Sequence, residues 1–543
     1  MSGFTALFLD RARAARDRVV ASLRDGRAAQ QAVFTRAIEA NRETVFGKAN
    51  GFGEVRTLAD YRRLVPIRPY EDYEPLIARV VAGERGVLTK ANPVLFMLTT
   101  GTTGNPKAIP ATRDYFQRST ENLLAYWACL VERYPEVLER DDTTVMLHMA
   151  PKPYTQWAAR GVAMHNPTCL PAEIKGGFPF SRAPWFPPPG DLTDGERLYY
   201  LLRCAAESAV YGFACLHPSR LQAFMLLVEK EGARLIDELR QGTVGGRPGP
   251  APNPGRADEL AALLARGPLS ARAIWPGLRF VSCWTGGSFR MYLPEIRERF
   301  GAEIFPQMSQ SSEAGHITLP LADGPDDGPL TLHTNFYEFL PVADGLRAEG
   351  DPLGYEELEV GKTYEMILTT TSGLYRYACG DLFRVLDLFE GVPRVEFVGR
   401  SGVSDLTGEK ITEEHINAAI QRATAACDLR ATNATCCALW GRPPSYGFLF
   451  EAHGEWRPDA AAALAAALDR DLAAQNSRYA LKRNFGDLGS ASVTLLARGT
   501  FARYRAELIA GGAPATQLKD KLLHRDAVVH ARLLALSAAE AAC

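Results

Sequence analysis

The first part of the chain has apolar residues at every third or fourth position, a spacing that predicts amphipathic helices over residues 1–90. The first apolar run that favours a strand is Pro93 to Leu98, which leads directly into a Thr/Gly-rich segment. Helical spacing returns from Arg113 to Leu138 and from Asp194 to Leu239. Between Gly242 and Gly255, glycine and proline replace the apolar positions, so a surface loop is expected there.

Short apolar runs and helical segments then alternate from Leu278 to Val385, the pattern expected of mixed α/β layers. The runs that favour strands are Arg279 to Trp284, Glu303 to Pro306 and Tyr364 to Thr369. After Arg400 the pattern of apolar and polar residues changes. The elements expected there are helices at Glu413 to Ala426, Pro458 to Asn476 and Phe501 to Ala510, and strands at Ala438 to Glu451 and Ala491 to Leu496.

These patterns predict an α/β fold with two domains. A chain of 543 residues exceeds what one hydrophobic core usually serves. The change of residue pattern near residue 400 predicts two domains. The first is a large N-terminal domain of mixed sheets and helices, residues 1–400, and the second is a smaller α+β C-terminal domain, residues 401–543.

The composition is that of an ordinary globular protein that acts on small molecules. Hydrophobic residues make up 46% and charged residues 23%, and 61 basic against 63 acidic residues give a net charge of −2. This balance lacks the positive charge of a protein that binds nucleic acid or an anionic membrane. The most apolar segment, Tyr199 to Leu216, is interrupted by Arg203 and Glu207, and we interpret it as a buried helix rather than a membrane span.

The cysteines and the N-terminal segment favour a cytoplasmic protein. The ten cysteines are scattered without a Cys-x-x-Cys pair, which indicates reduced thiols. The segment Met1 to Arg24 mixes apolar and charged side chains and has no apolar signal-peptide core. Its Arg/Ala bias leaves an organellar transit peptide as the alternative.

The Thr/Gly-rich segment Thr99 to Lys107 has the residue types of a phosphate-binding loop. Glycines let backbone N–H groups close around an anion, threonine hydroxyls donate further hydrogen bonds, and Lys107 adds a positive charge at the end. The spacing differs from that of the standard P-loop. A Thr/Gly-rich turn that binds nothing is the alternative interpretation.

A polar segment, Ser309 to Glu313, follows the expected strand Glu303 to Pro306. A carboxylate beside hydroxyls at the end of a strand suits a Mg²⁺ ion shared with ATP phosphates, because Mg²⁺ prefers hard oxygen ligands and few protein carboxylates. Glu313 is therefore the candidate metal ligand, with Ser311 and Ser312 beside it. A polar loop with one exposed glutamate is the alternative.

A third motif runs from Gly373 to Asp381 and is rich in aromatic residues. Asp381 follows a glycine and can accept hydrogen bonds from both hydroxyls of a ribose. Further along, the segment Gly408 to Lys410 supplies a lysine that can neutralise negative charge on a transferring phosphoryl centre. Taken singly, a Gly-Asp turn and a solvated lysine are the commoner cases.

Taken in order, these segments resemble the acyl-adenylating superfamily of firefly luciferase, acyl-CoA ligases and peptide synthetase adenylation domains. Within it, the chain is similar to the auxin-responsive promoter family of acyl acid amido synthetases, known from plants and with bacterial members. The resemblance runs nearly from end to end. The segments that carry it are Val65-Pro66-Ile67, Tyr70-Glu71-Asp72-Tyr73, Thr99 to Lys107, Ile274-Trp275-Pro276, Thr285-Gly286, Ser311-Ser312-Glu313, Phe336 to Pro341, Gly373 to Asp381, Lys410, Gly512-Ala513 and Gln517-Leu518-Lys519.

The resemblance implies roles for the candidate residues. Glu313 would hold Mg²⁺, Lys410 would reach the α-phosphate during adenylation, and Lys519 would act in the C-terminal segment, with Lys521 as its rival. The residues implied for ATP are Thr99, Thr100, Gly101, Thr102 and Lys107 around the phosphates, Thr285 and Gly286 near the base, Ser311 and Ser312 beside Glu313, Tyr375, Asp381 at the ribose, and Arg400 near the hinge or the ribose.

Several positions depart from the usual motifs of the family. Ser309 stands where an aromatic residue usually precedes the paired serines, and Ala378 and Cys379 replace an arginine and a valine. The C-terminal Lys-x-Pro-Arg of plant members is Lys519-Asp520-Lys521-Leu522 in this chain. These changes fit a divergent bacterial member, so the substrates of the plant enzymes cannot be assumed.

The activity implied by the resemblance is that of an ATP-dependent ligase. The carboxylate of an acid attacks the α-phosphate of Mg-ATP and releases pyrophosphate, and an amine, such as an amino acid, then opens the acyl-adenylate. Residues 401–543 are expected to form a mobile domain that rotates between these half-reactions. The alternatives are an acyl-CoA ligase, in which coenzyme A replaces the amine, and a non-catalytic nucleotide-binding relative.

The expected partners are a small-molecule carboxylic acid and an amine, without nucleic acid or membrane, and the chain is expected to be a monomer or a weak dimer. The helix Tyr115 to Tyr134 and the segment Phe336 to Phe339 are expected to build the acid pocket. Tyr126, Trp127 and Leu130 would suit an apolar or aryl acid, with core packing as the alternative.

Overall fold

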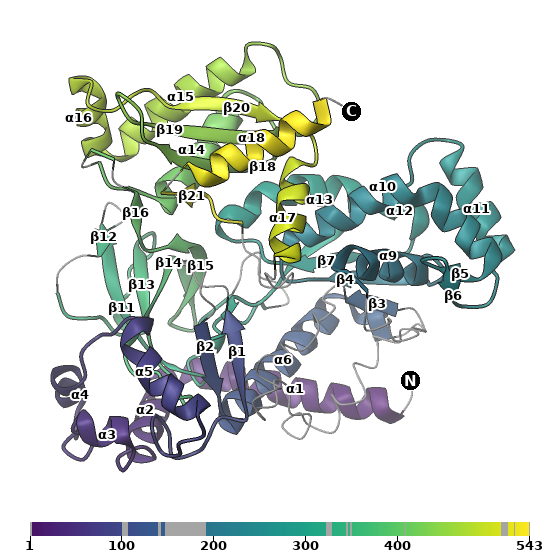
Figure 1. Cartoon of the computed structure of the whole chain (residues 1–543). Helices are drawn as coiled ribbons and strands as arrows, with labels where there is room; N and C mark the ends of the chain where they lie inside the picture. The colour runs from purple at the N-terminus through teal and green to yellow at the C-terminus, as the bar shows by residue number, and fades with distance from the viewer. Residues whose placement is uncertain are drawn as a thin grey trace.

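The computed structural model has a large lower body and a smaller upper domain (Figure 1). The elements before residue 400 build the body, and most of those after it build the upper domain, from which helix α17 (Thr500–Ala510) extends downward. The structure describes residues 3–99, 107–138, 143–146, 192–321, 328–343, 346–347, 350–404, 406–407, 409–511, 520–525 and 527–541.

The N-terminal segment is helical, as the spacing of its apolar residues predicts. Its helices are α1 (Gly3–Arg24), α2 (Gly26–Glu39), α3 (Val45–Ala49), α4 (Leu58–Leu64) and α5 (Tyr70–Val81). The side chains of Asp25, Thr44 and Thr57 cap α2, α3 and α4 by accepting hydrogen bonds from backbone N–H groups of the first turn. The chain entry into these helices is therefore fixed by local sequence.

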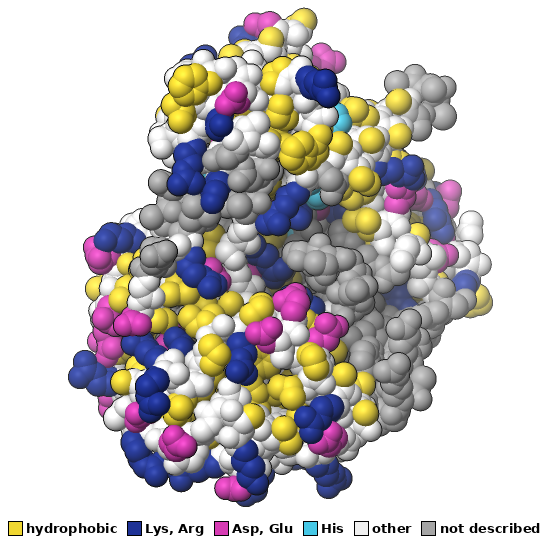
Figure 2. Space-filling view, turned by 60° about the vertical axis from the view of Figure 1, so that its left-hand side comes forward, with side chains coloured by type: hydrophobic (Ala, Val, Ile, Leu, Met, Phe, Trp, Pro, Cys, Tyr) yellow, Lys and Arg dark blue, Asp and Glu magenta, His cyan; other side chains and the backbone are white. Residues whose placement is uncertain are grey.

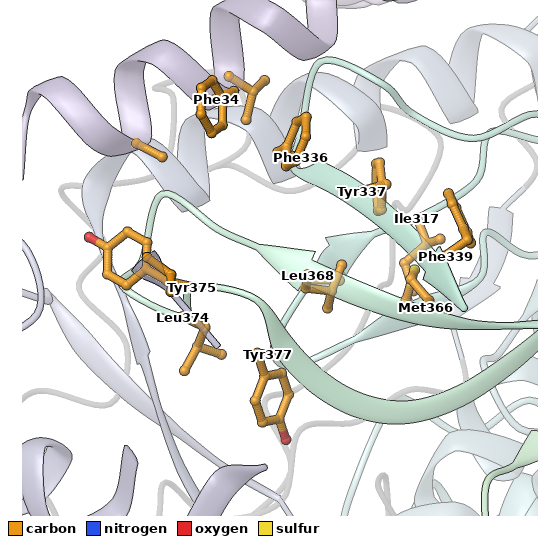
Figure 3. Packing of buried hydrophobic residues seen from close by; sticks show 14 of the residues in the cluster. Phe34, Ile317, Phe336, Tyr337, Phe339, Met366, Leu368, Leu374, Tyr375 and Tyr377 are labelled. Carbon is orange, nitrogen blue, oxygen red and sulfur yellow. The ribbon is translucent and has the colours of Figure 1, made fainter. Parts of the chain in front are cut away.

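Helices α2 to α5 pack on an antiparallel five-stranded sheet with the order β12-β11-β13-β14-β15 (Figures 1 and 3). Aromatic side chains fill the contact: Phe34 of α2 lies 5.2 Å from the ring of Phe336, centroid to centroid. The sheet consists of β11 (Phe336–Ala343), β12 (Leu346–Arg347), β13 (Thr363–Thr369), β14 (Tyr377–Phe389) and β15 (Val392–Arg400), with a 3-10 turn η4 (Tyr355–Glu357) between β12 and β13.

A second, parallel sheet has the order β3-β4-β7-β8 and is buried on both faces. Its strands are β3 (Thr143–Met146), β4 (Val210–Ala214), β7 (Phe280–Cys283) and β8 (Glu303–Pro306). One face packs on α1 and α6 (Arg113–Arg133), which η1 (Pro135–Leu138) follows. The other face packs on α9 (Asp194–Ala205), α10 (Pro218–Gln241), α11 (Pro254–Leu264), α12 (Ala271–Ile274), η3 (Gly287–Tyr292) and α13 (Leu293–Phe300).

Three short hairpins complete the body. They are β1 (Leu95–Thr99) with β2 (Lys107–Ala111), β5 (Thr243–Val244) with β6 (Arg247–Pro248), and β9 (Gln310–Ser311) with β10 (Gly315–His316). The expected surface loop Gly242 to Gly255 therefore contains a small hairpin whose tip, Gly245 and Gly246, is exposed and adopts positive φ angles.

The upper domain has its own core. Its four-stranded sheet has the order β20-β19-β18-β21, and helices α14 and α15 pack on one face of it while α17 and α18 contact the other. The elements are β16 (Val403–Ser404), β17 (Ile411–Thr412), α14 (Glu413–Ala426), β18 (Ala431–Leu439), β19 (Ser445–Ala452), α15 (Ala460–Gln475), α16 (Ser477–Phe485), β20 (Ser492–Leu496), α17, β21 (Leu523–His524) and α18 (Val528–Ala541).

The α/β fold class predicted from the sequence is confirmed, but one expected helix is wrong. The segment Asp194 to Leu239 consists of α9, strand β4 and α10, so the interpretation of Tyr199 to Leu216 as one buried helix fails. Every residue of β4 is buried between two helical layers. A strand that is buried on both faces loses the alternation of apolar and polar residues, and periodicity cannot distinguish it from a buried helix.

Two other boundaries differ from the prediction. The expected helix Arg113 to Leu138 ends at Arg133 and continues only as the short turn η1. The expected strand Ala438 to Glu451 is the end of β18, a turn at 440–444 and the strand β19. Within the described segments, no helix has the length and apolar content needed to cross a membrane.

Candidate adenylation site

The candidate site lies where the carboxyl ends of the parallel strands meet the antiparallel sheet. Parallel α/β sheets bind ligands at these ends, because every following loop begins there. Trp284, Thr285 and Gly286 follow β7, and the segment to Glu313 follows β8. The indole N–H of Trp284 donates to the carbonyl of Met308 at 3.0 Å and so joins the two segments.

The strand pair β1–β2 brings together the two ends of the expected phosphate loop. Thr99 and Lys107 are directly opposite each other in this antiparallel pair. The ammonium group of Lys107 lies 4.9 Å from the centroid of the Tyr70 ring, a cation–π contact that directs the side chain. Thr100, Gly101 and Thr102 lie outside the described residues.

Glu313 lies in the tight turn of the β9–β10 hairpin. The hydroxyl of Ser311 accepts a hydrogen bond from the N–H of Ala314 at 3.1 Å, and the carbonyl of Ser312 accepts one from the Tyr115 hydroxyl of α6 at 3.2 Å. Gly315 has a φ of +68°, a conformation that favours glycine and lets the hairpin turn back beside Tyr115. The two serines therefore shape the turn that holds Glu313.

The third motif places a tyrosine and an ion pair next to this glutamate. The hydroxyl of Tyr377, at the start of β14, donates to the Glu313 carboxylate at 3.4 Å. Four residues along the strand, Asp381 accepts from the guanidinium Nε of Arg400 at 3.0 Å, across the β14–β15 pair. Figure 3 shows Tyr377 extending away from the core side chains around Leu368. Tyr377 was not among the site residues predicted from the sequence.

The two carboxylates, Asp381 and Glu313, shift the pKa values of the cation and the hydroxyl beside them. The Asp381 carboxylate is the main cause that raises the pKa of Arg400 above its ordinary value; burial opposes it, and Glu313 adds to the rise. Burial, reinforced by Glu313, raises the pKa of Tyr377, so its hydroxyl stays protonated and donates. Cys379 lies between Tyr377 and Asp381 in the sequence. Burial also raises the pKa of its thiol, which therefore remains neutral.

The residues fit a Mg²⁺ ion that is held mainly by phosphates. Glu313 is 8% exposed and forms no ion pair with any residue that the structure describes. Burying a charged carboxylate without a cationic partner costs free energy, and a bound cation offsets that cost. No group of three or more His, Cys, Asp or Glu that could hold a metal occurs among the described residues. One carboxylate plus substrate phosphates is the arrangement in which Mg²⁺ is commonly bound.

Tyr375, an expected nucleotide-binding residue, is fully buried in the core. Its ring stacks on Phe46 at 4.8 Å between centroids, and its hydroxyl donates to the carbonyl of Leu88 at 2.8 Å. The next residue, Arg376, has a φ of +50°, an uncommon conformation for a residue other than glycine, just before β14 begins. This placement favours a packing role for Tyr375 that fixes the start of β14.

Thr285 and Gly286 lie beside the strand that ends in Arg400. The N–H of Gly287 donates to the Glu396 carboxylate of β15 at 3.4 Å. A side chain at Gly287 would approach the carbonyl of Phe397 to 3.0 Å, so a glycine with positive φ is required at this contact. The nucleotide-base candidates of the parallel sheet and the ribose candidates of the antiparallel sheet are thus brought to one place.

Lys410 is positioned by the upper domain. It follows the buried residue Glu409 and adopts a φ of +54°. The amide of Asn476 donates to the carbonyls of Glu409 and Lys410 at 2.9 and 3.3 Å and thereby fixes this conformation. Among the residues that the structure describes, the ammonium group of Lys410 forms no hydrogen bond or ion pair, including none with Glu313 or Asp381.

Of the two candidate lysines of the C-terminal segment, only Lys521 belongs to the part of the chain that the structure describes. Lys519 lies outside the described residues, whereas the Lys521 side chain is exposed.

The residues expected to line the acid pocket belong to the core. Tyr126, Trp127 and Leu130 are at most 1% exposed and pack against α1 and the parallel sheet, which favours the core-packing alternative for them. Figure 2 shows Lys and Arg side chains along the seam between the upper domain and the body, on the face that it displays.

Helix α6 also makes a buried histidine contact that the sequence did not single out. The ring Nδ1 of His316, on β10, lies 3.3 Å from the hydroxyl of Ser119. Burial is the main cause that lowers the pKa of His316 to about 4, against a smaller opposing hydrogen bond to Ser119. His316 is therefore neutral at physiological pH, three residues after Glu313.

This buried histidine makes the stability of the protein depend on pH. Its pKa is about 4 in the folded chain and 6.5 ordinarily, so below pH 6.5 the unfolded chain takes up a proton that the folded chain refuses. From about pH 7.5 to about pH 5, His316 should lower the free energy of unfolding by about 2 kcal/mol. Denaturant unfolding at both pH values should show that His316→Gln loses correspondingly less stability.

His453→Gln is the matched control, because His453 is a partly exposed histidine of the upper domain that lies 3.7 Å from Glu298. It should retain the pH dependence of the unmodified protein. An equal loss of stability in the unmodified protein and in His316→Gln would contradict the buried, neutral state of His316.

The chain is similar to known proteins in both fold and sequence. A structure of the AtGH3.15 acyl acid amido synthetase in complex with 2,4-DB superposes with a TM-score of 0.78 over 96% of both chains, at 19% identity. The jasmonoyl–L-amino acid synthetase GH3.5 of Oryza sativa subsp. japonica is 22% identical, over 91% of this chain and 92% of the relative. The indole-3-acetic acid-amido synthetase GH3.17 of Arabidopsis thaliana is 26% identical over 73% and 72%.

The parallel sheet, the antiparallel sheet and the second domain together form the same fold as this acyl acid amido synthetase structure. Sequence profiles of the GH3 family match residues 15–304 as its N-terminal domain, 328–400 as its central domain and 414–527 as its C-terminal domain. The chain therefore belongs to the GH3 family, whose members form amide bonds through an acyl-adenylate. The resemblance inferred from the sequence motifs is thereby confirmed.

Proposed function

We propose that this chain adenylates a carboxylic acid with Mg-ATP and transfers the acyl group to an amine, an amino acid in the first instance. The observation that carries the proposal is the meeting of three distant sequence motifs at one place. Lys107 lies against the Tyr70 ring. The Glu313 carboxylate contributes to the raised pKa of Tyr70, which is caused mainly by burial, and accepts a hydrogen bond from Tyr377. Asp381 pairs with Arg400, whose pKa Glu313 also raises.

Each residue of this group has a role in the proposed reaction. Thr99, Thr100, Gly101, Thr102 and Lys107 would surround the phosphates, Asp381 would accept hydrogen bonds from the ribose, and Arg400 would orient the Asp381 carboxylate through their ion pair. Glu313, supported by the Tyr377 hydroxyl, would hold Mg²⁺. When bound, Mg²⁺ neutralises charge on the phosphates. Thr285 and Gly286 would border the base, beside the indole of Trp284.

The reaction needs no covalent attachment to the protein. The acid carboxylate attacks the α-phosphorus, the bond to the bridging oxygen breaks, and pyrophosphate leaves with its electron pair. An amine then attacks the acyl carbon, AMP leaves, and the amine loses a proton to solvent. Lys410 would lower the first barrier by stabilising negative charge at the α-phosphate. Positioning and charge stabilisation supply the rest of the catalysis.

We also propose the division into residues 1–400 and 401–543 as the basis of a rotation between the half-reactions. Two observations support it: the upper domain has its own core, and the Lys410 ammonium group, in that domain, forms no hydrogen bond or ion pair with the described residues of the candidate site. A rotation would carry Lys410 toward the α-phosphate in one half-reaction and away from it in the other.

The test is acid-dependent release of pyrophosphate from Mg-ATP over a panel of aryl and alkyl acids, with product identification by mass spectrometry after addition of amino acids or coenzyme A. Release with one acid followed by an amide product is expected. A thioester product instead of an amide would favour the acyl-CoA ligase. Binding of ATP without release for any acid of a broad panel would favour a non-catalytic relative.

A further inference from the structure

A buried polar cluster joins the upper domain to the body. Its centre is the hydroxyl of Tyr292, the last residue of η3, which is 3% exposed. This hydroxyl contacts the Asp520 carboxylate, lies 2.9 Å from the side-chain oxygen of Asn433 on β18, and accepts a hydrogen bond from Arg505 of α17 at 3.2 Å. All three partners of Tyr292 belong to the upper domain.

The cluster contains a charged pair that is shielded from solvent. Arg505 donates to Asp520 at 2.7 Å, and their side chains are 12% and 17% exposed. Burial alone would raise the pKa of Asp520, but Arg505, His217 and the Tyr292 hydroxyl lower it below its ordinary value. Burial is also the main cause that raises the pKa of Tyr292, so the hydroxyl remains a donor between carboxylate and amide. The carboxylate keeps its charge because both domains supply its partners.

Two ion pairs also cross the seam, and both are more exposed than the cluster. Arg498 of the upper domain lies 3.3 Å from Glu229 of α10, with 59% and 30% of their side chains exposed. Arg430 and Glu298 lie 3.6 Å apart and are still more exposed. Solvent and salt screen such exposed pairs, so they contribute little to the domain arrangement. The Tyr292 cluster is the tightest connection among these.

The same segment also connects the cluster to the junction of the domains. Two residues after Asp520, the N–H of Leu522 donates to the Glu413 carboxylate at 2.8 Å. Glu413 begins α14 and lies against the end of β15, where a side chain at Gly399 would meet the Cβ of Glu413 at 3.6 Å. Arg400 follows Gly399 and pairs with Asp381. A short path of contacts thus leads from Tyr292 to the ribose candidate.

From these contacts we infer that Tyr292 and Asp520 are positioning residues, which hold residues 401–543 in the arrangement that serves one of the two half-reactions. This inference rests on the proposed function. The contacts exist only while η3, β18 and residue 520 are adjacent, so any rotation of the upper domain must break them. Removing them therefore disfavours one arrangement and leaves the other untouched.

The test is Tyr292→Phe, which keeps the ring and removes only the hydroxyl. Two rates are compared: acid-dependent exchange between ATP and pyrophosphate, and transfer of the acyl group from preformed adenylate to the amine. We expect these rates to change in opposite directions, so that their ratio shifts by about tenfold, the effect of losing a buried hydrogen bond to a charged group. Asn433→Ala, a second change in the same cluster, should shift the ratio in the same direction.

Tyr479→Phe is the matched control, because the Tyr479 hydroxyl donates to Asp469 at 2.6 Å within the upper domain and crosses no seam. It should leave the ratio of the two rates unchanged. Equal changes of both rates in Tyr292→Phe, or none, would overturn the positioning role.

Small-angle X-ray scattering of the substrate-free protein provides a readout that is independent of the reaction. The scattering profile of Tyr292→Phe should depart from that of the unmodified protein, whereas that of Tyr479→Phe should not. If the unmodified protein adenylates no acid, the proposed function fails, and the scattering alone decides whether the cluster holds the domains. Identical profiles together with an unchanged ratio would overturn the inference altogether.

Discussion

Lys410→Ala lowers the rate of acid-dependent pyrophosphate release by about a hundred- to a thousandfold, the loss typical of removing one group that stabilises transition-state charge. The lysine has a backbone fixed by Asn476 and no described partner for its ammonium group. That charge is therefore available to a substrate, and nothing else in the described fold depends on it. The measurement is single-turnover pyrophosphate release at saturating Mg-ATP.

Lys482→Ala is the control for this prediction. Lys482 belongs to the same domain, and its ammonium group forms an exposed ion pair with Asp487 at 2.9 Å. Its removal should change the rate by less than about twofold, since exposed pairs contribute little. Transfer of the acyl group from preformed adenylate should survive in Lys410→Ala. Pyrophosphate release at the unmodified rate in Lys410→Ala would remove Lys410 from the proposed mechanism.

Glu313→Gln is expected to lower adenylation by about a hundredfold and to raise the Mg²⁺ concentration needed for half-maximal rate. The amide has the shape of the carboxylate and still accepts a hydrogen bond from Tyr377, so the hairpin should keep its fold. What it lacks is the negative charge that would compensate the cation. A titration with Mg²⁺ at fixed ATP measures both effects.

Glu303→Gln provides the matched comparison. Glu303 begins β8, which leads into the same hairpin, but its carboxylate contacts Arg133 and Tyr134 at the opposite end of the strand. Its replacement should leave the Mg²⁺ requirement unchanged. The metal-binding role of Glu313 would be rejected if both variants showed the same Mg²⁺ dependence as the unmodified protein.

Much of the fold was predictable because it is encoded by neighbours in the sequence. Helix α14 and strand β8 have the bounds that the residue pattern predicted, since a Thr412 cap and a short apolar run specify them locally. The error at Tyr199 to Leu216 has the opposite origin. Strand β4 is defined by its hydrogen bonds to β3 and β7, which are remote in sequence, and by burial on both faces.

The candidate site was predictable only in part. The sequence supplied Lys107, Glu313, Asp381 and Lys410, because their motifs keep a recognisable order. It gave no reason to choose Tyr377 over Tyr375, which lie two residues apart in one aromatic run. Both tyrosines are buried in the same core, and only their partners in the fold distinguish them. The Tyr375 hydroxyl donates to the carbonyl of Leu88, whereas the Tyr377 hydroxyl donates to Glu313.

By itself, the sequence determined the family, the α/β class and the residue types that chemistry on phosphates requires. These properties depend on local patterns and on the order of motifs along the chain. The tertiary structure decided which of those residues meet, that His316 is buried and neutral, and that Tyr292 and Asp520 join the two domains. Such contacts link positions separated by hundreds of residues, and their strength depends on burial, which only packing of the whole chain creates.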